Sequence, residues 1–381
     1  MATTIARNNT AALFLPLKFG DHVIRDRLAM AALTRNRSSD TVPNALMREY
    51  YVQRARGGAG LIVTEGCLVS RQGTEWENAP GIWSAEQVAG WKDIVDAVHA
   101  EGGKIYCQLW HAGRVCHPET RHQKASGEPV YGPSPIAAHG GKFRFLPGVP
   151  GYVTPTEVPD PATLIELFRL GALKAKDAGF DGVEIHGANG YLVHQFLDAS
   201  SNQRTDKWGG SPENRSRFAI ELLKVLVDIW GPNVGAKFTP AGGYNDMGFP
   251  LDDTIATFGH LLSSIDTLGL AYVSLVRYSD YFDPEKRGTD HDVLATYAPF
   301  LKSTPLIPNG GITSGEAAEW VASGKYPAVF LGTLWMTHPD LAKRVKFGKE
   351  LANDLDGPHI YGGDFDPVIG YTDYPAAEYD Q

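Results

Sequence analysis

The stretch GVEIHGANGYLVHQF, residues 182–196, decides the fold because it joins a strand, a polar loop and a helix in one short segment. Its first residues are mostly apolar and β-branched, as in a short buried strand. Small residues then alternate with polar ones, and residues 192–197 have a helical pattern. The end of the strand therefore presents His186, Asn189 and Tyr191 on a tight loop that a ligand can approach closely.

These three side chains have complementary chemistry. Histidine and asparagine can both donate a hydrogen bond to one carbonyl oxygen, and tyrosine can deliver a proton beside it. Such donors stabilise the negative charge that a carbonyl oxygen gains during a reaction. A lone histidine would more often be a satisfied interior residue. The trio together predicts a site for a carbonyl compound, with Tyr191, His186 and Asn189 as catalytic residues.

Eight short apolar segments alternate with helical patterns, which predicts a (β/α)8 TIM barrel. A doubly wound sheet is the alternative, but the G-x-G-x-x-G turn that usually follows its first strand is absent. We expect a single barrel domain over residues 1–381, with a strand near 23–28 at the barrel bottom. The predicted barrel strands are 28–33, 61–64, 104–109, 180–186, 234–238, 271–276, 305–308 and 328–331. The predicted helices include 44–56, 85–100, 160–178, 212–229, 251–268, 290–301, 314–323 and 339–347.

Residues 112–158 follow the third predicted strand and are rich in proline and glycine, without a sustained period. A connection of this length in a compact protein is usually functional. We therefore expect an inserted lid or capping segment there.

Composition excludes several classes of partner. The net charge is −9 and there is no run rich in Lys or Arg, which argues against nucleic acid and anionic membranes. No apolar run approaches the roughly 20 residues that span a bilayer. The N-terminus lacks a signal-peptide pattern, and the three cysteines lack a C-x-x-C pair, so we expect free buried thiols in a cytoplasmic protein. The histidines lack metal-ligand spacing, so no metal is expected.

Polar residues and glycines gather where the predicted strands end. In a barrel these ends share one face, where active sites are built, and the loops after strands seven and eight often hold a phosphate. Backbone N–H groups at glycines and at a helix N-terminus suit such an anion. A flat phosphorylated cofactor would fit the residues at these ends, which are Thr34, Gly66, Gln108, His186, Lys237, Asn309, Gly310, Gly311 and Gly332.

At this point the motifs match a family. From about Leu13 to Tyr374 the chain resembles the Old Yellow Enzyme family of FMN-dependent ene-reductases, in its yeast-, plant- and fungal-type branch. The motif that follows the fourth strand, HGANGYL, is highly specific. The other matching motifs are ALTRNR (32–37), GGAGLIVTEG (57–66), CQLWHAGR (107–114), DKWGGSPENRSRF (206–218), THPDLAKRV (337–345) and GYTDYP (370–375).

The resemblance implies how a flavin would be held. Thr34 would bond the flavin near O4 and N5, with the backbone of Ala32 and Leu33 beside it. Gly66 and Gln108 would contact the pyrimidine edge. Lys237 would place positive charge near N1 and O2. Asn309, Gly310, Gly311, Gly332 and Thr333 would complete the cofactor site on its phosphate side.

The resemblance also implies the roles around the substrate. His186 and Asn189 would hold the carbonyl oxygen, and Tyr191 would protonate the α-carbon after hydride reaches the β-carbon. The expected pocket walls are Trp110, Tyr278, Trp335 and Tyr361. By default we expect Arg35 and Arg37 to be solvated loop charges, with the alternative that a nearby flavin pyrimidine or phosphoribityl chain uses one of them.

Two positions depart from the family pattern. Most members carry arginine where Lys237 stands, and lysine cannot make the bidentate fork. The usual phosphate motif resembles G-R-x-F, whereas this chain has Gly332-Thr333-Leu334-Trp335. The phosphate therefore loses a charge-assisted bond of roughly 1.5–3 kcal/mol. Backbone N–H groups at the glycines remain to hold it.

The resemblance implies an NADPH dehydrogenase and ene-reductase. Such an enzyme binds FMN, takes hydride from NADPH or NADH, and reduces the activated C=C bond of an α,β-unsaturated carbonyl or nitro compound. The expected partners are those small molecules, in a monomer or homodimer. The alternatives are a flavin-dependent isomerase or cyclase without net reduction, and a flavin-binding protein.

Overall fold

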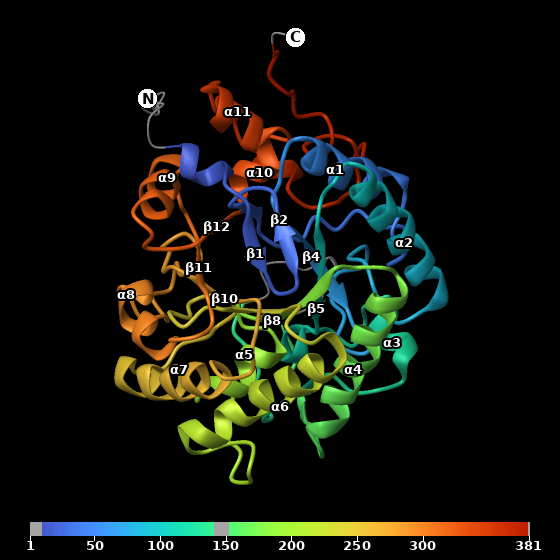
Figure 1. Cartoon of the computed structure of the whole chain (residues 1–381). Helices are drawn as coiled ribbons and strands as arrows, with labels where there is room; N and C mark the ends of the chain where they lie inside the picture. Colours follow the sequence, from blue (N-terminus) through green and yellow to red (C-terminus); the bar gives the residue numbers. More distant parts are fainter. Residues whose placement is uncertain (1–9, 141–151, 380–381) are drawn as a thin grey trace.

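The computed structural model describes residues 10–140 and 152–379. Eight parallel strands form a barrel, in the spatial order β11, β10, β9, β8, β5, β4, β3, β12, and β11 and β12 lie next to each other where it closes (Figure 1). This confirms the predicted TIM barrel. The strands are β3 (Leu28–Met30), β4 (Ile62–Leu68), β5 (Ile105–Trp110), β8 (Gly182–Gly187), β9 (Val234–Phe238), β10 (Tyr272–Val276), β11 (Leu306–Asn309) and β12 (Val329–Leu331).

Helices surround the barrel, and several begin at the capping residues that the sequence indicates. Ser84 and Gln87 form a reciprocal capping box at the start of α2, and Thr313 and Glu316 form another at α9. The helices are α1 (Ala45–Arg56), α2 (Ala85–Ala100), α4 (Ala162–Asp177), α5 (Leu192–Leu197), α6 (Pro212–Trp230), α7 (Leu251–Ile265), α8 (Val293–Tyr297), α9 (Ser314–Ala322), α10 (Thr333–Thr337) and α11 (Leu341–Phe347).

Several predicted boundaries were wrong. The second barrel strand, predicted over 61–64, continues to Leu68, and the helix predicted over 251–268 ends at Ile265. The helix expected over 290–301 is the short α8 followed by the 3-10 turn η3 (Ala298–Phe300), because Pro299 has no N–H to continue an α-helix. The first barrel strand ends at Met30 rather than at residue 33. The sequence analysis also missed α10, which begins directly after Gly332.

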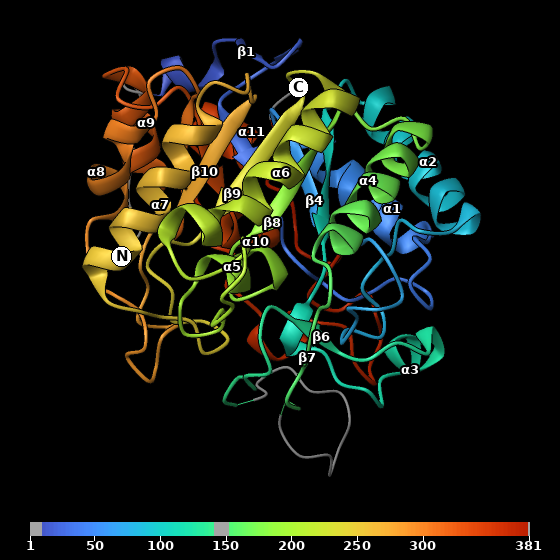
Figure 2. The same cartoon turned by 90° about the horizontal axis from the view of Figure 1, so that it is seen from below.

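The two ends of the barrel are covered differently (Figure 2). At one end β1 (Leu17–Phe19) and β2 (His22–Ile24) form an antiparallel hairpin. Phe19 is buried there against Tyr272 of the barrel, with ring centroids 5.1 Å apart. Only Val23 and Ile24 of the strand expected near 23–28 lie in this hairpin, which closes the barrel bottom, and Leu28 begins β3.

The opposite end carries the described part of the segment 112–158. It contains η2 (Gly113–Val115), α3 (Arg121–Ser126) and the short parallel pair β6 (Tyr131–Gly132) and β7 (Thr156–Glu157). Arg114 ties it to the loop after β9 by donating to the carbonyl oxygen of Asp246 at 2.9 Å. This placement agrees with a cap over the carboxyl ends of the strands, although residues 141–151 of the predicted lid lie outside the described residues.

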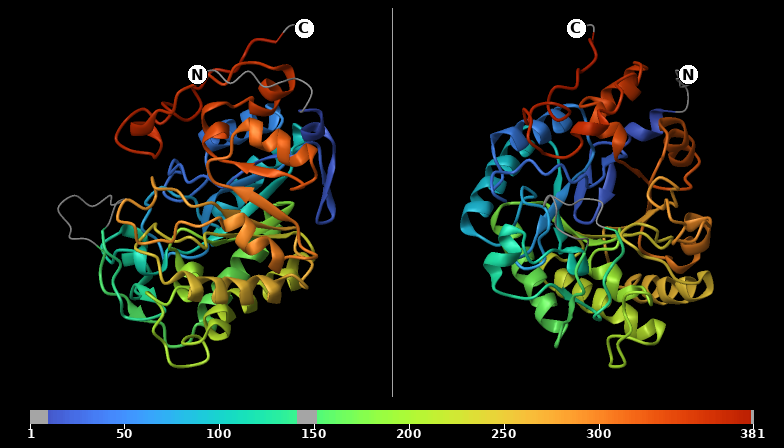
Figure 3. Two further views of the ribbon diagram at one scale, coloured as in Figure 1. Left: turned by 90° about the vertical axis from the view of Figure 1, so that its left-hand side faces the viewer. Right: turned by 180° about the vertical axis from the view of Figure 1, so that it is seen from behind.

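The chain after α11 returns across the molecule and packs on it (Figure 3). Arg35, expected to be solvated, is buried and donates to the carbonyl oxygen of Ile360 at 2.8 Å. Tyr371 is also buried and stacks on Tyr50, with ring centroids 4.2 Å apart. Carbonyl groups of the returning segment thus solvate a guanidinium that the sequence alone places in a loop.

The three cysteines are free and buried, as expected. Among the residues that the structure describes, no helix has both the length and the apolar character needed to cross a membrane.

Candidate functional site

Strand register brings the predicted polar residues together at the carboxyl end of the barrel. His186 on β8 lies beside Lys237 on β9, and Lys237 lies beside Ser274 on β10. On the other side, Gln108 on β5 lies between Gly66 on β4 and Glu184 on β8. Residues far apart in the sequence therefore lie beside one another on neighbouring strands, near the carboxyl end of the barrel.

His186 is a neutral hydrogen-bond donor toward that mouth. Its Nδ1 accepts a hydrogen bond from the backbone N–H of Ala188 at 3.3 Å, so the ring proton is on Nε2. Burial, with the nearby charge of Lys237, holds the pKa of His186 well below its usual value. The imidazole therefore presents an Nε2–H donor across the neutral pH range.

Asn189 supplies a second donor with a fixed orientation. Its backbone is in the left-handed region, at φ 56°, which asparagine tolerates better than most residues. Its Oδ1 accepts a hydrogen bond from the Thr239 hydroxyl at 3.1 Å, and its carbonyl oxygen accepts from Asn245 Nδ2 at 2.9 Å. Because Thr239 occupies the amide oxygen, the amide nitrogen remains as the donor.

Tyr191 packs against the same histidine. Its ring lies edge-on to His186 and to Trp110, with centroids 4.9 Å away in both cases. Burial raises the pKa of the Tyr191 hydroxyl well above its usual value, while the side chain of Asn245 lowers it. The phenol therefore stays protonated and can serve as a proton donor.

A polar network fills the barrel below this trio. Gln108 Nε2 donates to Glu184 Oε1 at 2.6 Å, and the Tyr272 hydroxyl donates to Glu184 Oε2 at 2.7 Å. Lys237 is buried and donates no hydrogen bond to any residue in the described part of the chain. Burial lowers the pKa of its ammonium group, and the nearby Glu184 carboxyl opposes part of this effect. A buried ammonium without an acceptor indicates a site for an anionic or strongly polar ligand.

The segment that contains Thr34 is hydrogen-bonded to a side chain of β4. Glu65 Oε2 accepts hydrogen bonds from the backbone N–H groups of Arg35 and Asn36, both at 3.2 Å. Leu33 lies next to Gly332, where an added Cβ would be 3.3 Å from the Leu33 side chain. Ala32, Leu33 and Thr34 are thus placed between the ends of β4 and β12.

Glu65 gives a testable pH dependence. Burial raises the pKa of its carboxyl from 4.5 to about 7, so the native state binds the proton more tightly than the unfolded chain. The contribution of Glu65 to the free energy of unfolding is greatest below about pH 4.5, where the carboxyl is protonated in both states. It is lost as the pH rises through about 7. Between pH 5 and pH 8 the free energy of unfolding of the parent should fall by about 3 kcal/mol because of Glu65. We expect this part of the fall to be absent in Glu65→Gln, as measured by urea unfolding at the two pH values.

The matched control is Glu49→Gln, since Glu49 is exposed on α1. It should leave the difference between the two pH values unchanged. A Glu65→Gln protein that loses as much stability as the parent between pH 5 and pH 8 would contradict this assignment.

The loops after β11 and β12 offer unused backbone donors. Gly310 and Gly311 have φ of +94° and +61°, in the region that favours glycine. Within residues 10–140 and 152–379, the N–H groups of Gly311, Ile312, Gly332 and Thr333 donate to no protein acceptor. Asn309 is buried, and its side chain makes no hydrogen bond to another described residue.

These donors fit the chemistry of FMN. Its phosphate needs several N–H donors at the edge of the barrel, and its polar ring needs a cation and amide groups deeper inside. The loops after β11 and β12 provide the first, and Lys237 with Gln108 provides the second. The backbone N–H groups of the two loops and the Lys237 ammonium have no acceptor among the described residues, whereas the Gln108 amide nitrogen already donates to Glu184.

The predicted pocket walls lie in three different places. Trp110 and Tyr361 belong to the same apolar cluster as Tyr191, and Trp110 covers Gly66, where an added Cβ would lie 2.7 Å from the indole. Trp335, in contrast, is wholly buried in the main core under α10. Its role as a wall stays a prediction, and the indole lies in a different cluster from Trp110 and Tyr191.

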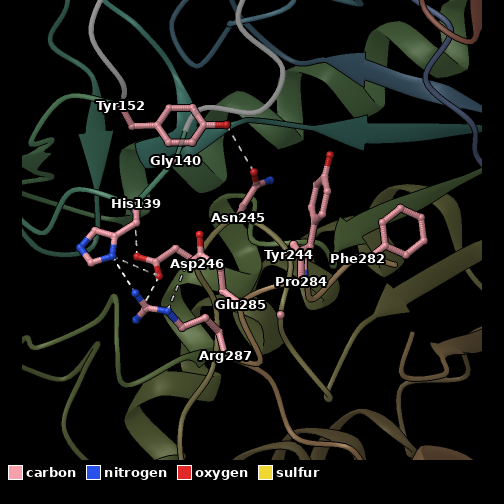
Figure 4. Close-up of a pocket in the computed structure, with 11 residues that line it drawn as sticks. His139, Gly140, Tyr152, Tyr244, Asn245, Asp246, Phe282, Pro284, Glu285 and Arg287 are labelled. Carbon is pink, nitrogen blue, oxygen red and sulfur yellow. Dashed lines mark hydrogen bonds and ion pairs between the residues drawn. The ribbon is translucent and has the colours of Figure 1, made fainter. Parts of the chain in front are cut away.

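Tyr278 is at the rim rather than in the cluster. Its hydroxyl donates to Asp280 and Asp283 of its own loop, both at 3.2 Å. An open hollow lies nearby, between the capping segment and the loops after β9 and β10 (Figure 4). None of the predicted site residues lines it, but Asn245 and Tyr152 do, and the Tyr152 hydroxyl donates to Asn245 Oδ1 at 3.3 Å. Asn245 therefore links this hollow to the Tyr191 loop.

Sequence reasoning missed several residues of the site. Glu184 carried a visible signal, since it is a carboxylate in the middle of an otherwise apolar strand. Thr239 and Asn245 carried none, because each acts through a side chain on a different loop.

Comparison with known proteins agrees with this geometry. Residues 12–352 match the model of the NADH:flavin oxidoreductase / NADH oxidase family. The chain is 37% identical to aldehyde reductase FrzD of a Cladobotryum species, over 97% of this chain and 95% of that protein. It is 36% identical to 12-oxophytodienoate reductase 2 of Arabidopsis thaliana, over 96% of each chain.

Solved structures extend the similarity to three dimensions. Morphinone reductase in complex with tetrahydroNAD superposes with a TM-score of 0.85 at 35% identity, covering 97% of this chain and 99% of that one. The Old Yellow Enzyme homologue from Zymomonas mobilis superposes with a TM-score of 0.85 at 32% identity, covering 95% and 99%. With its TIM barrel and its donors at the carboxyl ends of the strands, this chain belongs to the Old Yellow Enzyme family of NADH:flavin oxidoreductases.

Proposed function

We propose that this protein reduces the activated C=C bond of α,β-unsaturated carbonyl or nitro compounds, with FMN bound in the barrel and NADPH or NADH as the hydride donor. The observation that carries this proposal is the pair of donors, His186 Nε2–H and the Asn189 amide, beside the protonated phenol of Tyr191. Two free donors on one short loop are what a carbonyl or nitro oxygen would require, and an unactivated alkene has no oxygen to accept them.

Bound FMN would supply hydride transfer at its N5 position. Thr34, with Ala32 and Leu33 beside it, would hold the O4 and N5 edge. Gly66, Gln108 and Lys237 would hold the pyrimidine side, where the Lys237 ammonium stabilises negative charge. Phosphate binding would come from the loops after β11 and β12, which contain Asn309, Gly310, Gly311, Gly332 and Thr333.

His186 and Asn189 would donate to the substrate oxygen and withdraw electrons from the conjugated double bond. As the β-carbon accepts hydride, charge moves to that oxygen, where the two donors are already oriented. Tyr191 then gives its proton to the α-carbon, so that one hydride and one proton add across the double bond. Trp110 and Tyr361 would enclose the substrate beside Tyr191.

The same donors suit the carboxamide oxygen of a nicotinamide. The complex of morphinone reductase with tetrahydroNAD supports a nicotinamide nucleotide as the reductant here. We therefore propose that reductant and alkene use one site in turn.

An anaerobic stopped-flow experiment tests the proposal. NADPH or NADH should bleach the visible flavin absorbance, and cyclohexenone, maleimide or a nitroalkene should restore it. Nicotinamide consumption equal to the alkene reduced would separate a reductase from an isomerase or cyclase. Protein that stays colourless after incubation with excess FMN, or reduced protein that no alkene reoxidises, would overturn the proposal.

A further inference from the structure

Arg277 follows β10 and lies against the loop after β11. Its Nε donates to the carbonyl oxygen of Gly310 at 2.8 Å, and its Nη2 donates to the carbonyl oxygen of Gly311 at 2.7 Å. One guanidinium thus holds two successive carbonyl groups of the glycine loop. The planar fork of arginine suits this task, since its donors are fixed relative to one another.

The two carbonyl contacts determine where the following N–H groups point. In a trans peptide the C=O of one residue is antiparallel to the N–H of the next, because the unit is planar. With the carbonyl oxygens of Gly310 and Gly311 turned toward Arg277, the N–H groups of Gly311 and Ile312 are directed away from it. Successive backbone N–H groups in such a loop form a concave anion site.

These two N–H groups have no acceptor among the described residues. Ile312 is buried, so its unused donor has little access to bulk water. The loop after β12, with the unused donors of Gly332 and Thr333, lies on the neighbouring strand. The two loops therefore offer unused donors at the same edge of the barrel.

The guanidinium itself is fixed in place. Its Nη1 donates to Glu316 Oε1 at 2.9 Å. The other oxygen of Glu316 accepts from the backbone N–H of Thr313 at 2.8 Å, within the capping box of α9. Since three of its nitrogens bond to the protein and a carboxylate balances its charge, Arg277 is suited to orient the loop rather than to bind the anion itself.

We propose that Arg277 is a positioning residue for the FMN phosphate. By orienting backbone N–H groups toward the phosphate, it compensates for the missing positive charge of an arginine at position 333. Position 333, where the family motif carries arginine, is threonine here. The phosphate is then held mainly by oriented backbone N–H groups, and Arg277 keeps them oriented. This inference rests on the proposed function, because it requires that the barrel binds FMN.

The test compares two flavins that differ only in the phosphate. Deflavinated full-length protein is titrated with FMN and with riboflavin, and the quenching of flavin fluorescence gives both dissociation constants. In Arg277→Met we expect the FMN dissociation constant to rise at least tenfold and the riboflavin constant to change less than twofold. Arg277→Lys keeps the charge but loses the fork, so we expect it to lose most of the preference for FMN too.

Arg169→Met is the matched control, since Arg169 is a partly exposed arginine that donates to Glu166 at 2.6 Å on α4, away from the site. It should leave both constants unchanged. Equal weakening of FMN and riboflavin, or an unchanged preference for FMN in Arg277→Met or Arg277→Lys, would overturn the inference. If Arg277→Met does not fold, Arg277→Lys decides. A parent protein that binds neither flavin would refute the proposed function itself, so the two failures are distinguishable.

Discussion

The double variant His186→Ala/Asn189→Ala is expected to reduce cyclohexenone about 10⁴-fold more slowly than the parent, since one such donor contributes about 10²–10³ in rate. In the proposed mechanism both donors act on the same oxygen, and His186 stays neutral, so no change of pH should restore the rate. A para-substituted phenol would lose its oxyanion partners as well. Its binding and the long-wavelength charge-transfer absorbance with the flavin should therefore be lost.

Reduction of the flavin by the nicotinamide should also slow in the double variant, because the carboxamide oxygen uses the same donors. Thr239→Val is a graded comparison: it keeps both donors but releases the oxygen of the Asn189 amide. We expect its loss to be much smaller than that of the double variant. Unchanged phenol binding and charge-transfer colour in the double variant would refute the assignment of these two residues.

Tyr191→Phe is expected to separate the two half-reactions. A general acid contributes about 10²–10⁴ in rate, so reoxidation of the reduced flavin by an enone should slow by that factor. Hydride transfer from the nicotinamide needs no proton from this phenol, so flavin reduction should stay within about twofold of the parent. Because the pKa of Tyr191 lies well above its usual value, the parent rate should show no tyrosine titration at neutral pH.

Anaerobic stopped-flow absorbance measures both steps in one preparation. Tyr131→Phe is the matched control, since it removes a phenol of the capping segment that donates to Glu128 at 2.9 Å and hydrogen-bonds to no residue of the His186 loop in the described chain. Its two rates should both remain near those of the parent. Equal losses in the two half-reactions of Tyr191→Phe would show that this phenol has a structural role.

The parts of the fold that could be predicted depend on local signals. Strand and helix positions follow from hydrophobic periodicity, and the start of α2 follows from the Ser84 capping box. The length predicted for the helix at residues 290–301 is wrong, because Pro299 has no N–H with which to continue an α-helix. The trio of His186, Asn189 and Tyr191 was found because all three lie on one short loop.

Other features depend on partners that are distant in the sequence. Thr239 orients an amide fifty residues away, and Arg35 is buried by a carbonyl group more than three hundred residues away. Trp335 is predicted as a pocket wall, and only the structure shows that it lies in a different cluster from Trp110. No local pattern indicates in which cluster an indole will pack.

By itself the sequence determined the barrel, the face that carries the site and the chemistry of the His186 loop. These properties follow from the order of apolar and polar residues along short segments, and parallel strands then bring their ends together. Tertiary structure alone decided which tautomer His186 adopts in its surroundings, which end of the Asn189 amide is free and which carbonyl groups Arg277 holds. A hydrogen bond depends on angstrom-scale distance and direction, and these are set only when separate loops pack against one another.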